Sequence, residues 1–164
     1  MTPRAAIVGS GLGGLVAYAA LRHGGLLAPG EIAVFGDHED PAGAWRPRAE
    51  AIRQRLMRSE SDGHCAPTSF PGLAAREALR RRDLAPLLLS VCDRYRPTVA
   101  EFLRHVDELR ERSGWDGSRV PGRVERVRAT AGGFEVDGHG PFPHVLLALG
   151  HPGLARPAEL AHDP

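Results

Sequence analysis

Three glycines near the amino terminus have the spacing of a phosphate-binding turn. Gly9, Gly11 and Gly14 form a G-x-G-x-x-G pattern between an apolar run, Ala5–Val8, and a segment of helical character, Leu12–His23. A strand, a glycine turn and a helix in this order are typical of dinucleotide binding. The first glycine permits the tight turn, the second lets the backbone approach a pyrophosphate, and the third lets the helix pack close to the strand.

This turn defines the first candidate site. A helix N-terminus offers free N–H groups and the positive end of its dipole to phosphate oxygens. We therefore expect a pyrophosphate to be bound by five residues of the turn and the helix start: Gly9, Ser10, Gly11, Leu12 and Gly14. The alternative is a secretory signal with an A-x-A cleavage site at Ala17–Ala19. Four glycines within the supposed apolar core and a single basic residue before it argue against that alternative.

A carboxylate near the end of a second strand would complete a dinucleotide site, because it binds the ribose hydroxyls. The second strand is expected at Ile32–Phe35, and Gly36 occupies the place of the expected acid. Asp37 follows and is the candidate ribose ligand. The alternative is that Asp37, Glu39 and Asp40 only solvate a loop.

An aromatic and a basic residue stand together in the next loop, at Trp45 and Arg46. Tryptophan can cover a flat ring, and arginine can neutralise a phosphate or reach an anionic substrate. The alternative is a core anchor beside a surface charge. Further along, His64 and Cys65 are adjacent, but a nucleophile pair needs contact in space, so we interpret both as structural.

Length and composition restrict the class of protein. The 164 residues are expected to form one domain, and the net charge of +1 indicates neither a nucleic-acid partner nor a membrane partner. The two cysteines do not form a C-x-x-C motif, so neither a redox dithiol nor a metal site is indicated. No apolar run reaches the length of a membrane span. We expect a cytoplasmic protein.

The middle of the chain is expected to be mainly helical. Helices are predicted over Glu50–Arg58 and Leu73–Arg82, and the leucine-rich segment Leu84–Tyr95 is expected to pack in the interior. Thr98 and Glu101 have the spacing of a capping box, and apolar residues with helical periodicity follow them. Gly114 is expected to end that helix.

The last third has the pattern of strands. A short strand is expected at Arg119-Val120, and alternation over Val124–Ala129 and Phe134–Asp137 predicts an antiparallel meander, with turns at 130–133 and 138–140. The near-continuous apolar run Val145–Leu149 predicts a buried parallel strand. Gly150 follows, where the backbone can approach a ligand.

This order of elements resembles the FAD-binding domain of flavoproteins with two dinucleotide-binding domains: the flavin-containing monooxygenases, the Baeyer–Villiger monooxygenases and the amine N-hydroxylases. The resemblance runs from about Ala5 to Pro152. The glycine turn is similar to the family's pyrophosphate motif. Gly43-Ala-Trp-Arg46 is similar to its Gly-Gly-x-Trp-Arg segment, with Ala42 replacing the first glycine, and Ala148-Leu-Gly-His-Pro152 resembles its Ala-Thr-Gly signature.

Two further likenesses concern one segment and one single residue. The segment Tyr95–Leu103 is similar to the family's helix start before the meander, and Val124 stands where the family's backbone meets the adenine. The resemblance implies an α/β Rossmann-like FAD-binding domain over residues 1–150, a parallel sheet with a helical insertion and an antiparallel β-meander, and a tail over 151–164. It places Trp45 and Arg46 near the flavin, and it brings Leu149 and Gly150 to the cofactor.

The resemblance also implies a function. An FAD-dependent oxidoreductase of monooxygenase type would use reduced flavin and oxygen to oxygenate an amine, a sulfide or a ketone. These 164 residues contain neither the family's NADPH-binding domain nor its returning Gly-Asp segment. The missing domain is expected in a separate polypeptide, with a shortened gene as the alternative, and a second polypeptide or a homo-oligomer is expected to cover the incomplete side. No residue is assigned a catalytic role.

Two other functions are considered beside this one. A non-catalytic nucleotide-binding or interaction module, present as a subunit or a relic, would keep the glycine turn without the chemistry. A small NAD(P)-dependent reductase is disfavoured, since the chain has no lysine and hence no Tyr-x-x-x-Lys pair.

Overall fold

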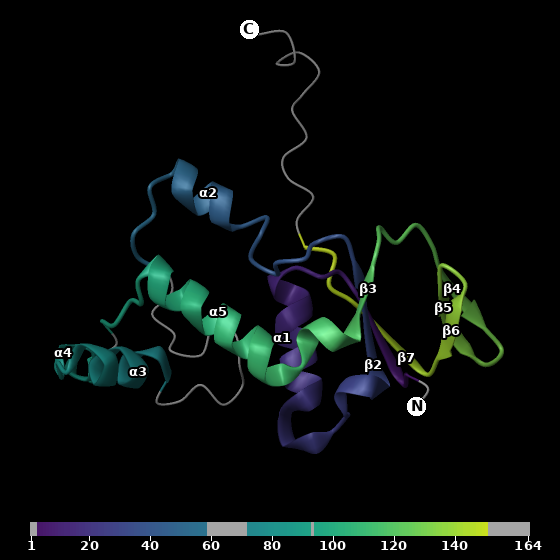
Figure 1. Ribbon diagram of the computed structural model, residues 1–164, viewed down its shortest axis with the longest axis horizontal. Coiled ribbons are helices and arrows are strands. Elements are labelled where there is room, and N and C mark those ends of the chain that lie inside the picture. The colour runs from purple at the N-terminus through teal and green to yellow at the C-terminus, as the bar shows by residue number, and fades with distance from the viewer. Residues whose placement is uncertain (1–2, 59–71, 93, 151–164) are drawn as a thin grey trace, which may run out of the picture.

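The computed structural model describes residues 3–58, 72–92 and 94–150, and its architecture is α/β (Figure 1). Four parallel strands form one sheet in the order β3-β2-β1-β7. The bounds of these strands, in sheet order, are Arg119–Pro121, Ile32–Gly36, Ala5–Val8 and His144–Leu147. The strands expected near the amino terminus and at residues 119–120 are therefore confirmed. Helix α1, Leu12–Arg22, follows the glycine turn as predicted.

A separate antiparallel sheet of three strands forms the meander, in the order β4-β5-β6. Its strands are Val127–Thr130, Gly133–Val136 and His139–Phe142. The second turn, predicted at 138–140, is wrong, because Val136 pairs with His139 and the turn consists of residues 137 and 138. Asp137 and Gly138 both have positive φ, 45° and 82°. This backbone geometry matches the twist of a tight hairpin, so the strand resumes at once.

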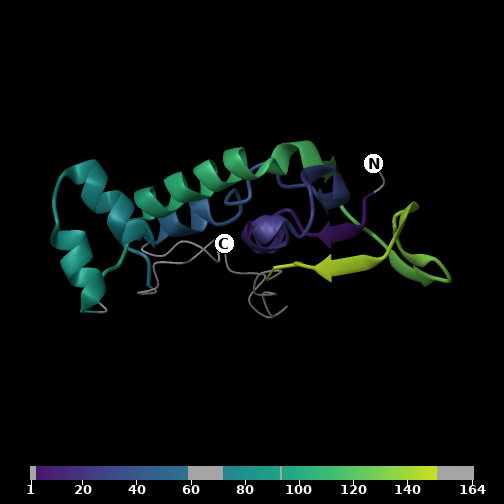
Figure 2. The same cartoon turned by 90° about the horizontal axis from the view of Figure 1, so that it is seen from below.

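The helical segment lies between β2 and β3. It contains α2 (Arg46–Ala51), α3 (Gly72–Arg81), α4 (Ala85–Val91) and α5 (Val99–Ser113). Helix α5 runs beside α1, and α3 and α4 lie at the end of α5 that is remote from the sheet (Figure 1 and Figure 2). Among the described residues, no helix combines the length and apolar character that crossing a bilayer requires.

The start and end of α5 agree with the predicted signals. The Thr98 hydroxyl accepts a hydrogen bond from the Glu101 N–H at 3.1 Å, and Gly114 ends the helix with a left-handed φ of 79°. The Glu101 carboxylate accepts hydrogen bonds from Arg80 and Arg104, each at 2.6 Å. The side chain of Glu101 therefore joins α5 to α3 through Arg80.

The predicted helix over Glu50–Arg58 is wrong for most of its length. Helix α2 ends at Ala51, and Arg53 adopts a positive φ of 51°. Leu56 then forms an antiparallel bridge with Thr98, flanked by hydrogen bonds from Met57 N to Pro97 O and from Val99 N to Arg55 O. Pairing with the chain before α5 thus holds this segment extended, and local helical propensity does not decide its structure.

The expectation that Leu84–Tyr95 packs in the interior is also wrong for α4. Leu88 is 67% exposed and Val91 is 85% exposed, while Pro86 is the buried residue of this helix. The reason is the position of α4 at the periphery of the molecule, where its neighbour is α3 (Figure 2).

The apolar core has two layers, one on each face of the parallel sheet. Ile7 and Val34 belong to the layer that faces α1 and α5. In the same layer, Tyr18 of α1 and Trp115, which follows α5, pack edge to face with ring centroids 5.3 Å apart. The opposite face of the sheet packs against the meander, and its buried residues are Ala6, Val8, Ala33, Phe35, Val136 and Phe142. In sequence, a strand that is covered on both faces is a continuous run of apolar residues, and β1 and β2 both have this pattern.

Strand β7 is parallel to β1 as predicted, but the prediction that it is buried is wrong. Leu146 is 40% exposed and Leu147 is 59% exposed. β7 is an edge strand, and the helices of the described part of the chain lie over the inner strands. Val145, by contrast, packs against the buried residues between the parallel sheet and the meander.

Candidate functional site

A cleft of about 650 Å³ opens at the carboxyl ends of the parallel strands. Its lining comes from the glycine turn, the end of β2, the loop before α2, the segment after β3 and the end of β7. The structure brings together here most of the residues expected from the sequence: Gly9, Ser10, Gly11, Leu12, Asp37, Trp45, Val124, Leu149 and Gly150. Ligands of open α/β sheets bind in such a crevice, outside the carboxyl ends of the strands.

The glycine turn is held between two strands. Gly9 donates a hydrogen bond from its N–H to the Phe35 carbonyl at 2.8 Å, and Ala148 N donates to the Val8 carbonyl at 2.7 Å. Gly9 has a φ of 117°, and a Cβ at this position would lie 2.1 Å from the Ala148 carbonyl oxygen. Both the backbone angle and the close approach to the end of β7 therefore require glycine.

The space beside Gly11 is open. A Cβ built on Gly11 would meet only the Pro41 carbonyl oxygen, at 3.9 Å, and Gly11 lines the cleft. Its φ of −82° is one that any residue adopts, so the missing side chain is a matter of space in the cleft. The first helical hydrogen bond runs from Leu15 N to Gly11 O, which leaves the preceding N–H groups of α1 without helical partners. An open space beside free N–H groups suits a phosphate.

Gly14 lies outside the lining of the cleft. A Cβ on Gly14 would lie 2.0 Å from the Gly9 carbonyl oxygen and 3.4 Å from the Trp115 ring. This glycine lets α1 pack on the turn, which is the role of the third glycine in the motif.

The end of β2 explains why an acid is missing there. A Cβ on Gly36 would lie 2.4 Å from Ser10 Oγ and 2.6 Å from Ser10 N. The Ser10 hydroxyl in turn accepts a hydrogen bond from His38 N at 2.9 Å. Asp37 follows Gly36 in the lining of the cleft, with its carboxylate 3.9 Å from His38 Nε2.

Trp45 and Arg46 are adjacent in the chain, but their side chains lie in different environments. Trp45 lines the cleft and packs against the Phe102 ring at 5.3 Å. Arg46 instead donates from Nε to Asp40 at 2.6 Å and from Nη2 to Asp107 at 2.9 Å, and it does not line the cleft. Its guanidinium fastens the loop before α2 to α5.

These ion pairs change the pKa of both partners. Partial burial raises the pKa of Asp40, but hydrogen bonds from Arg46 and from Ala42 N outweigh this effect, and the net shift is downward. The pKa of Arg46 is raised, chiefly by its hydrogen bond to Asp40. Both groups are therefore charged across the neutral range.

Two arginines of the cleft were missed by the sequence reasoning. Arg48 and Arg123 line the cleft, and neither forms an ion pair within the part of the chain that the structure describes. Their signals were available, since Arg48 follows Trp45 by three residues and Arg123 directly precedes Val124. These two guanidinium groups make the lining more cationic than the motif predicts.

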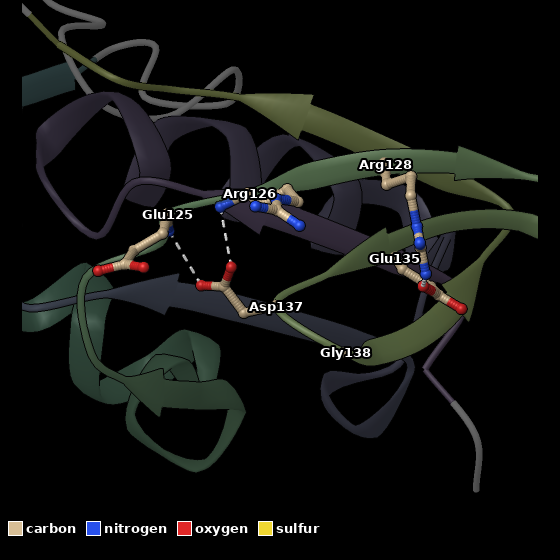
Figure 3. Close-up of a pocket in the computed structure, with 6 residues that line it drawn as sticks. All are labelled: Glu125, Arg126, Arg128, Glu135, Asp137 and Gly138. Carbon is tan, nitrogen blue, oxygen red and sulfur yellow. Dashed lines mark hydrogen bonds and ion pairs between the residues drawn. The ribbon is translucent and has the colours of Figure 1, made fainter.

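A second hollow, of about 390 Å³, lies on the meander (Figure 3). Three of its charged side chains have partners within the meander. The Asp137 carboxylate accepts hydrogen bonds from the N–H groups of Glu125 and Arg126, at 3.0 and 2.8 Å, and Arg128 pairs with Glu135 at 2.6 Å. In the close-up, the Asp137, Arg128 and Glu135 side chains are thus engaged by the meander itself.

Several residues singled out in the sequence lie outside the described residues. They are His64 and Cys65, and also His151 and Pro152 of the segment that follows Gly150. Cys92 is exposed as a free thiol. Within residues 3–58, 72–92 and 94–150, no group of three or more His, Cys, Asp or Glu side chains is placed to hold a metal ion.

Comparison with known proteins finds no match to this chain, either among protein-family models or among curated proteins and solved structures.

Proposed function

We propose that the protein binds FAD in this cleft and forms the flavin-binding part of an FAD-dependent oxidoreductase of monooxygenase type. The observation that carries the proposal is the open space beside Gly11, directly before the first turn of α1 and at the carboxyl ends of parallel strands. A diphosphate is the group that such a turn accepts. The proposal classes the parallel sheet with its first β–α–β unit as Rossmann-like.

The remaining lining fits the other parts of a flavin dinucleotide. Asp37 lies at the end of β2, where a carboxylate binds ribose hydroxyls. Val124 offers an apolar contact to adenine, and Trp45 offers an aromatic surface on the α2 side of the cleft. Leu149 and Gly150 bring the end of β7 to the ligand.

The protein's part in the reaction is binding and orientation. Bound flavin supplies the redox chemistry, accepting electrons from a nicotinamide and passing them to oxygen. The chain's own residues hold the dinucleotide, and the Trp45 and Leu149 side chains cover apolar parts of it. In this proposal the NAD(P)H site belongs to another domain or polypeptide, in contact with the same cleft.

A non-catalytic nucleotide-binding module is the second candidate. It is favoured by the chemical groups of the cleft, which are N–H groups, arginines and one carboxylate within the described residues. Such groups bind a nucleotide of any kind. A module of this kind would bind ADP as tightly as FAD.

The test is retention of flavin. The protein is mixed with FAD, desalted and examined by absorption spectroscopy, with circular dichroism as the check that it is folded. Retained flavin bands, and a Kd for FAD below the Kd for ADP, support the first proposal. Equal affinities favour the non-catalytic module, and folded protein that binds neither ligand contradicts both.

A further inference from the structure

We propose that Arg48, and not Arg46 of the tryptophan–arginine pair, is the side chain that binds the diphosphate of the dinucleotide. The inference rests on the proposed function, because it assigns one residue of the same cleft. It concerns an anionic diphosphate and a guanidinium, which can form two parallel charge-assisted hydrogen bonds.

The Arg46 side chain is already paired with other residues of the fold. Its Nε and Nη2 atoms donate to two different carboxylates, those of Asp40 and Asp107. Asp40 is held in place by a further hydrogen bond from Ala42 N at 2.8 Å. The charges of two carboxylates outweigh that of one guanidinium, so the cluster around Arg46 offers no net positive charge to a phosphate.

Arg48 is free for this role. It lines the cleft, and no ion pair engages it within the described residues. Trp45 has helical backbone angles, so residues 45 and 48 are neighbours at the i, i+3 spacing on one side of α2. Both side chains line the same cleft. The arrangement joins an aromatic surface to an unpaired cation.

The loop that leads into α2 borders the glycine turn, and Arg48 lines the same cleft from α2. The Pro41 carbonyl oxygen is the nearest atom to a Cβ built on Gly11, at 3.9 Å, so this loop borders the glycine turn. Arg123 lies beside the end of β2, because the adjacent Gly122 donates its N–H to the Gly36 carbonyl at 3.3 Å. Arg123 therefore belongs to the ribose side, with Asp37 as the carboxylate there.

The experiment measures FAD and ADP binding by the wild-type protein and three variants, using quenching of flavin fluorescence for FAD and calorimetry for ADP. We expect Arg48→Gln to raise Kd about tenfold for both ligands, because one charge-assisted contact is lost. Arg48→Lys is expected to recover part of the affinity. Arg55→Gln is the matched control, since Arg55 is an exposed arginine outside the lining of the cleft.

Salt provides the readout that a structural role would not change. Affinity of the wild type is expected to fall more steeply with ionic strength than that of Arg48→Gln, because screening weakens a contact that the variant lacks. Equal affinities of wild type and Arg48→Gln would overturn the assignment while leaving the proposed function intact. Loss of FAD binding with unchanged ADP binding would also overturn it, since the diphosphate is common to both. Wild-type protein that binds neither ligand would remove the proposed function and this inference together.

Discussion

The Ser10 side chain occupies the space that a side chain on Gly36 would need. A Cβ on Gly36 would lie 2.4 Å from Ser10 Oγ, and Ser10 itself is 1% exposed. The turn after β1 thus packs directly on the last residue of β2. This contact excludes a carboxylate at the end of β2, and the nearest acid in the chain becomes Asp37.

The first prediction concerns this contact. Gly36→Ala is expected to lower the free energy of unfolding by about 3 kcal/mol, because the added methyl group overpacks a closed site. Ser10→Ala is expected to cost only about 1 kcal/mol, for the hydrogen bond from His38 N. Urea unfolding measures both variants. The double variant should remain destabilised, since the Ser10 backbone N lies 2.6 Å from the added Cβ. Full recovery in the double variant would contradict the packing described here.

The second prediction separates the binding role of one glycine from the structural role of another. Gly11→Val is expected to leave the unfolding midpoint within a few degrees of wild type and to abolish FAD retention, because its side chain would enter open space in the cleft. Gly14→Ala is expected to destabilise the fold, since its Cβ would lie 2.0 Å from the Gly9 carbonyl oxygen. Thermal unfolding and flavin absorbance measure the two effects. A stable Gly11→Val that keeps flavin would argue against a phosphate at this turn.

The third prediction is a pH dependence at the Asp40–Arg46 pair. The pKa of Asp40 is lowered in the folded state, so its stabilising effect is present above its unfolded value of about 3.9 and is lost as the pH falls through the folded value. Asp40→Asn is expected to lose about 1.5 kcal/mol at pH 7. Urea unfolding should show this difference shrinking below pH 4. Glu39→Gln, in the same loop, is the control, and an equal loss in it would point to a general charge effect.

The fourth prediction concerns His105, which is buried between α5 and α3. Burial and the nearby Arg76 lower its pKa, with partial opposition from Glu108 and Glu101. Arg76 donates to its Nδ1 at 3.2 Å, which requires the neutral ring at that nitrogen, and its Nε2 has no hydrogen-bond partner within the described residues.

The unfolded chain therefore binds a proton at His105 more readily than the folded protein does. Stability is expected to fall as the pH drops below about 6.5, by at most about 1.4 kcal/mol for each pH unit. His105→Gln should flatten this part of the profile, as measured by urea unfolding from pH 7 to pH 5. An unchanged slope in the variant would assign the pH dependence to other groups.

Local patterns predicted the elements whose signals lie within a few residues. The glycine turn with its strand and helix, the Thr98 start of α5, its Gly114 end and the first hairpin of the meander all follow from backbone geometry and capping. The same reasoning failed for residues 52–58 and for α4. Pairing with a distant segment holds Leu56 extended, and the leucines of α4 are exposed because that helix lies at the periphery.

The site was predictable to the same extent. Sequence spacing located the glycine turn, because a phosphate-binding turn is a local structure. It could not show that Arg46 is paired with Asp107, which lies 61 positions away, and so it could not distinguish Arg46 from Arg48.

By itself, the sequence determined the α/β class, the order of the main strands and helices, and the glycine turn. These features depend on periodicity, turn geometry and the absence of a Cβ, which neighbouring residues specify. Only the tertiary structure decided which charged side chains are paired within the fold and which remain available in the cleft. That division depends on ion pairs between remote segments, and the energy of an ion pair depends on distances that sequence spacing does not encode.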